Sequence, residues 1–121
     1  MRIINNKMEG KNFDYDNFSD SLIISRKQTD EKVQGSAEIG NLILDFTNTG
    51  KIVNIEFQHI SKFLEVMNVN PNILNELTAV DLIVQKQKGA VFLLATLITP
   101  TLKQPLPLAT IPVTRQLASS V

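Results

Sequence analysis

Several residue types that carry chemistry are scarce or missing in this 121-residue sequence. Cysteine is absent, which excludes disulfides, thiolate metal sites and cysteine nucleophiles. Neither a glycine-rich phosphate-binding loop nor a nucleophile elbow occurs. Twelve basic residues balance twelve acidic ones, and no basic cluster of the kind that binds nucleic acid is visible. We therefore expect neither a nucleic-acid partner nor a cofactor.

Long hydrophobic runs are also missing. The longest, residues 90–98, spans nine positions, whereas a membrane-spanning helix needs about 20. Residues 1–12 are polar and lack the apolar segment of a secretion signal. These absences lead us to expect a cytoplasmic protein that does not associate with membranes.

The composition is that of a globular chain, with 43% hydrophobic and 20% charged residues, which argues against disorder. At this length we expect one domain over residues 12–114. Residues 1–11 are polar and aperiodic, so we predict a flexible arm there, and a loose tail over residues 115–121.

The strongest pattern is a β-hairpin over residues 40–57. Apolar residues alternate with others on both sides of Thr47-Asn48-Thr49-Gly50, and Gly50 tolerates the left-handed backbone of a tight turn. Similar but weaker patterns predict strands over 13–16, 21–26, 33–39, 79–86, 90–99 and 106–113. Residues 90–99 are apolar on both faces, so we expect a central strand covered on each side. Pro107 and Pro112 place the last strand at a sheet edge.

A helical spacing replaces the alternation after residue 58. Ile60, Phe63, Leu64 and Met67 recur at i, i+3, i+4 and i+7, and Ser61 is placed to cap the helix. Asn70-Pro71 ends it and begins a short second turn. We therefore predict an α+β fold of two antiparallel β-meanders, 12–58 and 79–113, joined by a short helical connector over 60–77.

Combining the strand phases divides the first sheet into two faces. The predicted inner face contains Leu22, Ile24, Leu42, Leu44, Phe46, Val53, Ile55 and Phe57. The outer face is polar apart from three isoleucines, which need cover from elsewhere. We therefore predict a homodimer whose interface residues are Ile23, Ile43, Ile52 and Phe92.

Four carboxylates are the candidates for ligand or metal chemistry: Asp16, Asp20, Asp45 and Glu56. Two of them could serve as an acid/base pair or as oxygen ligands for Mg²⁺ or Ca²⁺. Turn capping by Asp16 and Asp20 and solvent-facing strand positions for Asp45 and Glu56 are the favoured explanation, and the spacing matches no Ca²⁺ loop. His59, the only histidine, has no orienting carboxylate or nucleophile nearby in sequence, which favours local packing or hydrogen bonding.

Part of the first half resembles a known family. The matching segments are Tyr15-Asp16, Asp20 to Ile24, Leu42 to Phe46, Gly50 to Val53 and Ile55 to Phe57, followed by a short helix containing Ser61. Together they resemble the family catalogued as domain of unknown function 2283, over about residues 13–64. The resemblance implies a small α+β fold without a known biochemical role. Some members look like partners of a neighbouring toxin-like protein.

These observations favour a non-enzymatic module that assembles with itself or binds another protein. Two alternatives remain open. One is an antitoxin-like or regulatory partner of another small protein, which the resemblance suggests. The other is a metal-dependent hydrolase that uses Asp16, Asp20 and Glu56.

Overall fold

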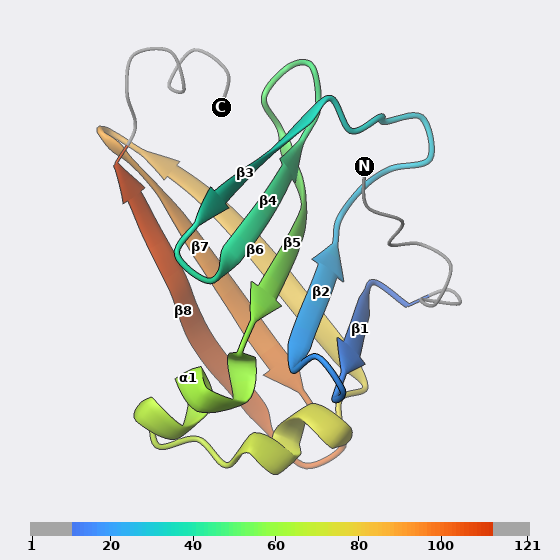
Figure 1. Cartoon of the computed structure of the whole chain (residues 1–121), viewed down its shortest axis with the longest axis vertical. Helices are drawn as coiled ribbons and strands as arrows, with labels where there is room; N and C mark the ends of the chain where they lie inside the picture. Colours follow the sequence, from blue (N-terminus) through green and yellow to red (C-terminus); the bar gives the residue numbers. More distant parts are fainter. Residues whose placement is uncertain (1–10, 113–121) are drawn as a thin grey trace.

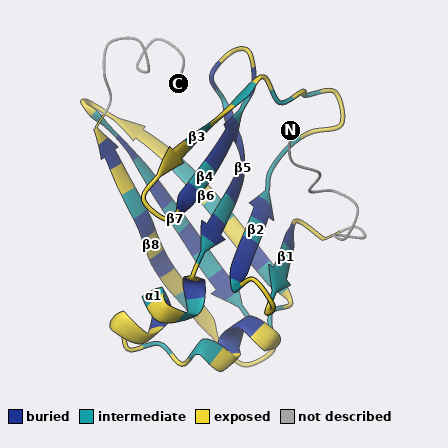
Figure 2. Cartoon of the chain, viewed as in Figure 1, coloured by how far each residue is buried: buried dark blue, intermediate teal, exposed yellow. Residues whose placement is uncertain are grey.

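The chain forms two stacked antiparallel β-sheets, closed at one end by two short helices (Figure 1). The computed structural model describes residues 11–112, so the predicted tail, and the predicted arm up to residue 10, lie outside the described residues. The facing sides of the sheets and the helices share one hydrophobic core, seen as the buried inner positions in Figure 2. The described residues are mostly β, so α+β holds only in a broad sense.

The first sheet contains five strands: β1 (Phe13–Asp16), β2 (Ser21–Ser25), β3 (Gly35–Ile39), β4 (Leu42–Phe46) and β5 (Ile52–Gln58). Their spatial order is β1-β2-β5-β4-β3, so the predicted meander is wrong for this half of the chain. The arrangement is a Greek key, in which β5 returns to pair with β2. Burial explains the order: five of the seven residues of β5 are buried, whereas β3 is polar and mostly exposed. The most buried strand takes the centre, and a polar, mostly exposed strand takes an edge.

The predicted hairpin is present as β4, a turn and β5. Gly50 has φ 84, and the turn is closed by a hydrogen bond from the Gly50 amide to the Thr47 carbonyl (2.9 Å). A β-bulge interrupts the pairing, because Asp45 lies opposite Asn54 but Phe46 lies opposite Ile52. The extra residue turns Ile52 into the core, where it is only 7% exposed. Its predicted position on the outer face is therefore wrong.

Two other details of the first sheet differ from simple alternation. Phe46, predicted to be buried, is only half-buried at the edge of the core. Its ring lies beside Gly35, where an added Cβ would meet the ring at 3.1 Å. Gly35 pairs with Phe46 in regular register. The glycine makes room for the aromatic ring across the strand pair.

The second sheet is the meander that the sequence predicts. It contains β6 (Ala79–Gln87), β7 (Ala90–Ile98) and β8 (Lys103–Pro112), in the order β6-β7-β8. Gly89, with φ 82, lies in the first turn. The strand β8 begins at Lys103, three residues before the predicted start at residue 106. Its prolines lie at the sheet edge, as predicted. Every second residue of β7 is buried, so its other face points away from the core.

The helices α1 (Ile60–Val66) and η2 (Pro71–Asn75, a 3-10 helix) cover the open end between the sheets. They contribute four buried side chains to the core: Ile60, Leu64, Ile73 and Leu74. The Asn70 side chain accepts a hydrogen bond from the Asn72 amide (3.0 Å) and caps η2. Within residues 11–112, no helix has the length and apolar character needed to cross a membrane.

Candidate functional site

A hydrogen-bonded junction centred on Asp20 joins the β1–β2 turn to the start of α1. One Asp20 oxygen accepts from the Tyr15 hydroxyl (2.8 Å), and the other accepts from the Ser61 hydroxyl (2.7 Å). The Ser61 amide also approaches both oxygens (3.2 Å each). The Asp20 carbonyl accepts from the Ile60 amide (3.2 Å). Asp20 therefore caps a helix 41 positions away in sequence.

The predicted capping role of Ser61 is thus wrong. The N-cap residue is His59, whose side chain makes no capping hydrogen bond. The cap comes instead from Asp20, to which the Ser61 hydroxyl donates. Both Asp20 (φ 55) and His59 (φ 57) have left-handed backbones, which are costly for residues other than glycine. The junction is held in this geometry by its hydrogen bonds and by the buried Ile60 next to it.

The junction shifts the pKa values of Asp20 and Tyr15. Partial burial favours a higher pKa for Asp20, but hydrogen bonds from Ser61 and Tyr15, together with nearby His59, outweigh it and lower the pKa. Burial, the hydrogen bond to Asp20 and the charges of Asp20 and Asp16 raise the pKa of Tyr15 to about 12. At neutral pH the pair is therefore a carboxylate that accepts from a protonated phenol. Such a pair stabilises structure and does not supply a base.

The four candidate carboxylates do not come together. Asp16 accepts from the Phe18 amide and the Ser19 hydroxyl in the β1–β2 turn, and Asp20 faces α1. Glu56 pairs across the sheet with Ile43, one row away from Asp45. In residues 11–112, no group of three or more His, Cys, Asp or Glu side chains is placed to hold a metal ion. The predicted set of Asp16, Asp20 and Glu56 is not assembled as a metal site.

Asp45 is a buried carboxylate in a polar row on the outer face of the first sheet. It accepts from the Ser36 hydroxyl (2.6 Å) and from the Asn54 side-chain amide (3.1 Å). Both Asp45 and Asn54 are 3% exposed. The Asn54 side-chain oxygen is buried without a hydrogen-bond partner. Buried acceptors are usually satisfied, so this oxygen is an exception to that rule.

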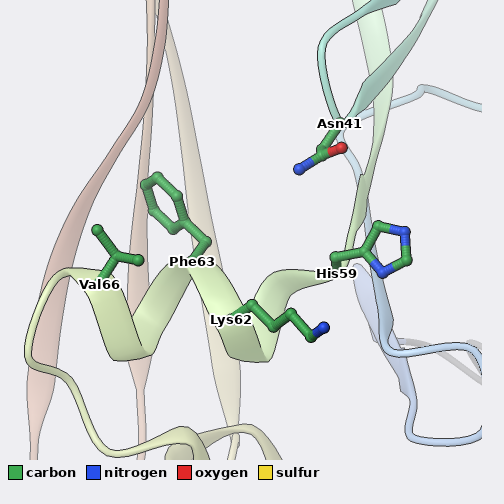
Figure 3. A pocket seen from close by; sticks show the side chains of 5 residues that line it. All are labelled: Asn41, His59, Lys62, Phe63 and Val66. Atoms are coloured by element: carbon green, nitrogen blue, oxygen red, sulfur yellow. The ribbon is translucent and has the colours of Figure 1, made fainter.

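An open pocket of about 480 Å³ lies between α1 and the β3–β4 turn. Figure 3 shows Phe63 and Val66 at one end, Lys62 reaching toward His59 at the other, and Asn41 across from the helix. The His59 ring points away from the apolar end. Among the described residues, no carboxylate or nucleophile lines the pocket, so none of its lining residues is a partner for His59 in general-base chemistry.

The remaining candidate surfaces are the outer faces of the two sheets, and three of the predicted interface residues lie on them. Ile23 and Ile43 lie on the five-stranded sheet, on either side of Glu56. Phe92 lies on the three-stranded sheet. They therefore belong to opposite sides of the molecule.

Sequence reasoning missed several neighbours that complete these faces. Asp14 and Glu38 join the isoleucine row, and Ile83 and Leu94 join Phe92. The sequence predicted the four strands that carry these residues, but the grouping of the residues depends on which strands pair. The expectation that β7 is covered on both sides is wrong for the described residues, because no third layer forms among residues 11–112.

No curated protein and no solved structure matches the chain. A family model does match, over residues 12–61. This segment contains the whole five-stranded sheet and ends at Ser61, the residue that Asp20 binds. It stops before the three-stranded sheet that covers its inner face. Residues 12–61 therefore match the family described as Protein of unknown function (DUF2283), which confirms the resemblance, and the rest of the chain is unmatched.

Proposed function

We propose that this protein is a non-enzymatic assembly module that forms a homodimer through the outer face of its three-stranded sheet. The observation that carries the proposal is the near absence of charge on that face. Its fifteen positions, taken from the strand register, include only Asp81 and Lys103 as charged residues. The others are Ala79, Ile83, Gln85, Gln87, Ala90, Phe92, Leu94, Thr96, Ile98, Pro105, Pro107, Thr110 and Pro112.

The centre of this face is a row of three apolar side chains. Ile83 lies opposite Leu94, which lies opposite Pro107, and Phe92 and Thr96 flank Leu94 along β7. Ile83 is 50% exposed. A contiguous apolar sheet surface of this kind is typical of interfaces, because soluble monomers rarely leave one exposed to water.

The size of the face sets the expected affinity. Three strands about 4.8 Å apart and nine residues long give a surface of roughly 14 by 30 Å, or about 400 Å². Specific interfaces commonly bury about 800 Å² on each partner. We therefore expect a reversible dimer with a dissociation constant of about 10–100 µM, corresponding to a binding free energy of about −5 to −7 kcal/mol.

The opposite face is a poorer surface for self-association. The five-stranded sheet presents Asp14, Glu56 and Glu38 in one row with its isoleucines. Two such faces brought together by a twofold axis would place acidic side chains near one another, which costs free energy. Of the predicted interface residues, Phe92 is thus the one retained for the homodimer.

Sedimentation equilibrium over about 5–500 µM protein tests the proposal, since this range brackets the expected dissociation constant. We expect Leu94→Glu to give a monomer throughout the range, because a buried charge at the centre of the interface is unfavourable. Ile43→Glu is the matched control on the other sheet and should leave the dimer intact. Circular dichroism checks that both variants are folded. A wild-type monomer at 500 µM, or a dimer unaffected by Leu94→Glu, would refute the proposal.

A further inference from the structure

One edge of the three-stranded sheet has almost no backbone partner. The edge strand β6 is nine residues long, contains no proline, and is apolar over residues 82–84. The Asn12 side-chain amide donates to the Val80 carbonyl (2.6 Å), and no other hydrogen bond among residues 11–112 reaches the β6 backbone from beyond β7. A long apolar edge of this kind pairs readily with another strand, so proteins usually cover it.

The strand register shows which backbone groups of β6 are open. Successive residues of an antiparallel strand direct their amide and carbonyl alternately to the two sides, and the Val80 carbonyl is directed away from β7. The two-residue turn after β6 agrees, because the residues that flank it, Gln87 and Ala90, lie opposite each other and bond to each other in turns of this kind. Three edge residues therefore present both groups on the free side: Leu82, Val84 and Lys86.

The core-facing side chains of this edge are incompletely covered. Val80 is buried, but Leu82 and Val84, which follow it on the same side of β6, are only half-buried although they pack against the core. The neighbouring strand β7 has a strand on each side and buries every core-facing residue. A further strand beside β6 would cover Leu82 and Val84 in the same way.

The first residues of the chain are in reach of this edge. Besides its contact with Val80, Asn12 accepts through its own carbonyl from the Ser25 amide (2.7 Å), so it is held beside the start of β6. Residues 5–10 equal residues 82–87 in number, and six extended residues span about 20 Å. Followed back from Asn12, they run beside β6 in the opposite direction to it, which gives an antiparallel pair.

We propose that residues 4–10 pair with the free edge of β6 as an added antiparallel strand of the same chain. Ile4 and Met8 lie four positions apart, so a strand places both side chains on one face. With Asn12 level with Val80, Met8 lies opposite Val84, on the face that is turned to the core. The other face of the added strand is polar: Asn5, Lys7 and Glu9.

The connection through Asn12 favours this occupant over others. A tethered segment binds its neighbour at a high effective concentration and does not lose the translational freedom that association costs. A second copy of the chain, or a segment of another protein, would have to overcome that loss and displace residues 4–10 as well.

Hydrogen exchange of the full chain, labelled with ¹⁵N and followed by NMR, tests the proposal. We expect the amides of the edge residues to exchange about tenfold more slowly than unprotected amides, equally at about 100 and 500 µM protein. The Ile83 and Gln85 amides, which bond to β7, are the internal reference. Nuclear Overhauser effects between residues 4–10 and β6 give a second readout that needs no variant.

Two variants of the full chain separate pairing from the mere presence of these residues. Lys7→Pro with Met8→Pro removes a backbone donor on each side of the added strand and should abolish the protection of the edge residues. Lys7→Ala with Met8→Leu keeps both donors and should preserve the protection. All four substitutions lie outside the described strands, and circular dichroism checks that both variants are folded.

Three results would overturn the proposal. Edge amides that exchange as fast as unprotected ones would show that the edge is open. Protection that survives the two prolines would show that another segment covers β6. Protection that rises with protein concentration would show that a second copy supplies the strand. The Leu94→Glu test of the dimer is independent of all three, because it concerns the outer face of the sheet and not its edge.

Discussion

Replacing Asp20 with Asn tests whether the charge of one carboxylate holds α1 to the first sheet. The substitution keeps the size of the side chain and suits the backbone, since Asn tolerates the left-handed conformation that Asp20 adopts at φ 55. It removes the negative charge that accepts from the Tyr15 hydroxyl and from the Ser61 hydroxyl and amide. The only intended change is therefore in the strength of these hydrogen bonds.

The magnitude follows from the three donors. Hydrogen bonds to a charged group contribute about 1.5–3 kcal/mol each and neutral ones about 1 kcal/mol, and an amide oxygen can satisfy one donor but not all three. Because Asp20 is partly solvated, the sum must be discounted. We expect Asp20→Asn to lower the free energy of unfolding by about 1–2 kcal/mol. Asp20→Ala, which loses every acceptor and the helix cap, should cost about 2–4 kcal/mol.

Tyr15 provides an independent readout, because it is the only tyrosine and the chain has no tryptophan. Phenolate absorbance therefore reports on this residue alone. In the wild type Tyr15 has a pKa of about 12, raised by burial first and then by Asp20 and Asp16. In Asp20→Asn the burial remains but the main charge is gone, so the pKa should fall toward its ordinary value without reaching it.

Urea denaturation at pH 7 gives the stability difference, and an absorbance titration gives the pKa. Circular dichroism at each pH of the absorbance titration serves as the control that both proteins are still folded. If Asp20→Asn leaves the Tyr15 titration and the unfolding midpoint both unchanged, the junction does not hold the helix and the argument fails.

Three further predictions concern pH, the core and the backbone. Asp20 has a lowered pKa, so its contribution is present above the unfolded value of 3.8 and is lost as the pH falls through the folded value. The difference in unfolding free energy between wild type and Asp20→Asn should therefore vanish in acid, and an equal difference at pH 7 and pH 2 would contradict this. Leu93→Ala, at a fully buried core position, should cost about 2–4 kcal/mol in urea denaturation, whereas Thr96→Ala on the outer face should cost less than about 1 kcal/mol. His59→Gly should be more stable than His59→Ala by about 1 kcal/mol in thermal unfolding, because glycine accepts φ 57 without strain; the reverse order would be incompatible with a left-handed N-cap.

Local patterns predicted the elements of this fold well because their signals lie within a few residues. The β4–β5 hairpin follows from alternation around Gly50, and the edge position of β8 follows from its prolines. The strand order of the first sheet was not predictable in this way. Alternation shows that a strand has two faces, but it does not show that β5 inserts between β2 and β4.

The candidate surfaces were only partly predictable for the same reason. The bulge at Val53 moves Ile52 from the outer face into the core, and no residue near it signals the shift. The cap on α1 comes from Asp20, far beyond the range in which capping patterns are read. The acidic row was present in the sequence as separate residues, yet only the register brings Asp14, Glu56 and Glu38 into one line.

The prolines of β8 limit how far this sheet can be extended by pairing of further strands at its edges. Pro105, Pro107 and Pro112 lie in a strand that stays paired with β7, so their missing donors fall on its free side. A further strand added there would find too few amide groups to bind. The other edge strand, β6, has no proline, so a further strand can pair with the sheet only at the β6 edge. If two molecules pair through their β6 strands, the outer edges of the joined sheet are both β8 strands. Their prolines block the addition of a third molecule, so the sheet cannot grow into a fibre.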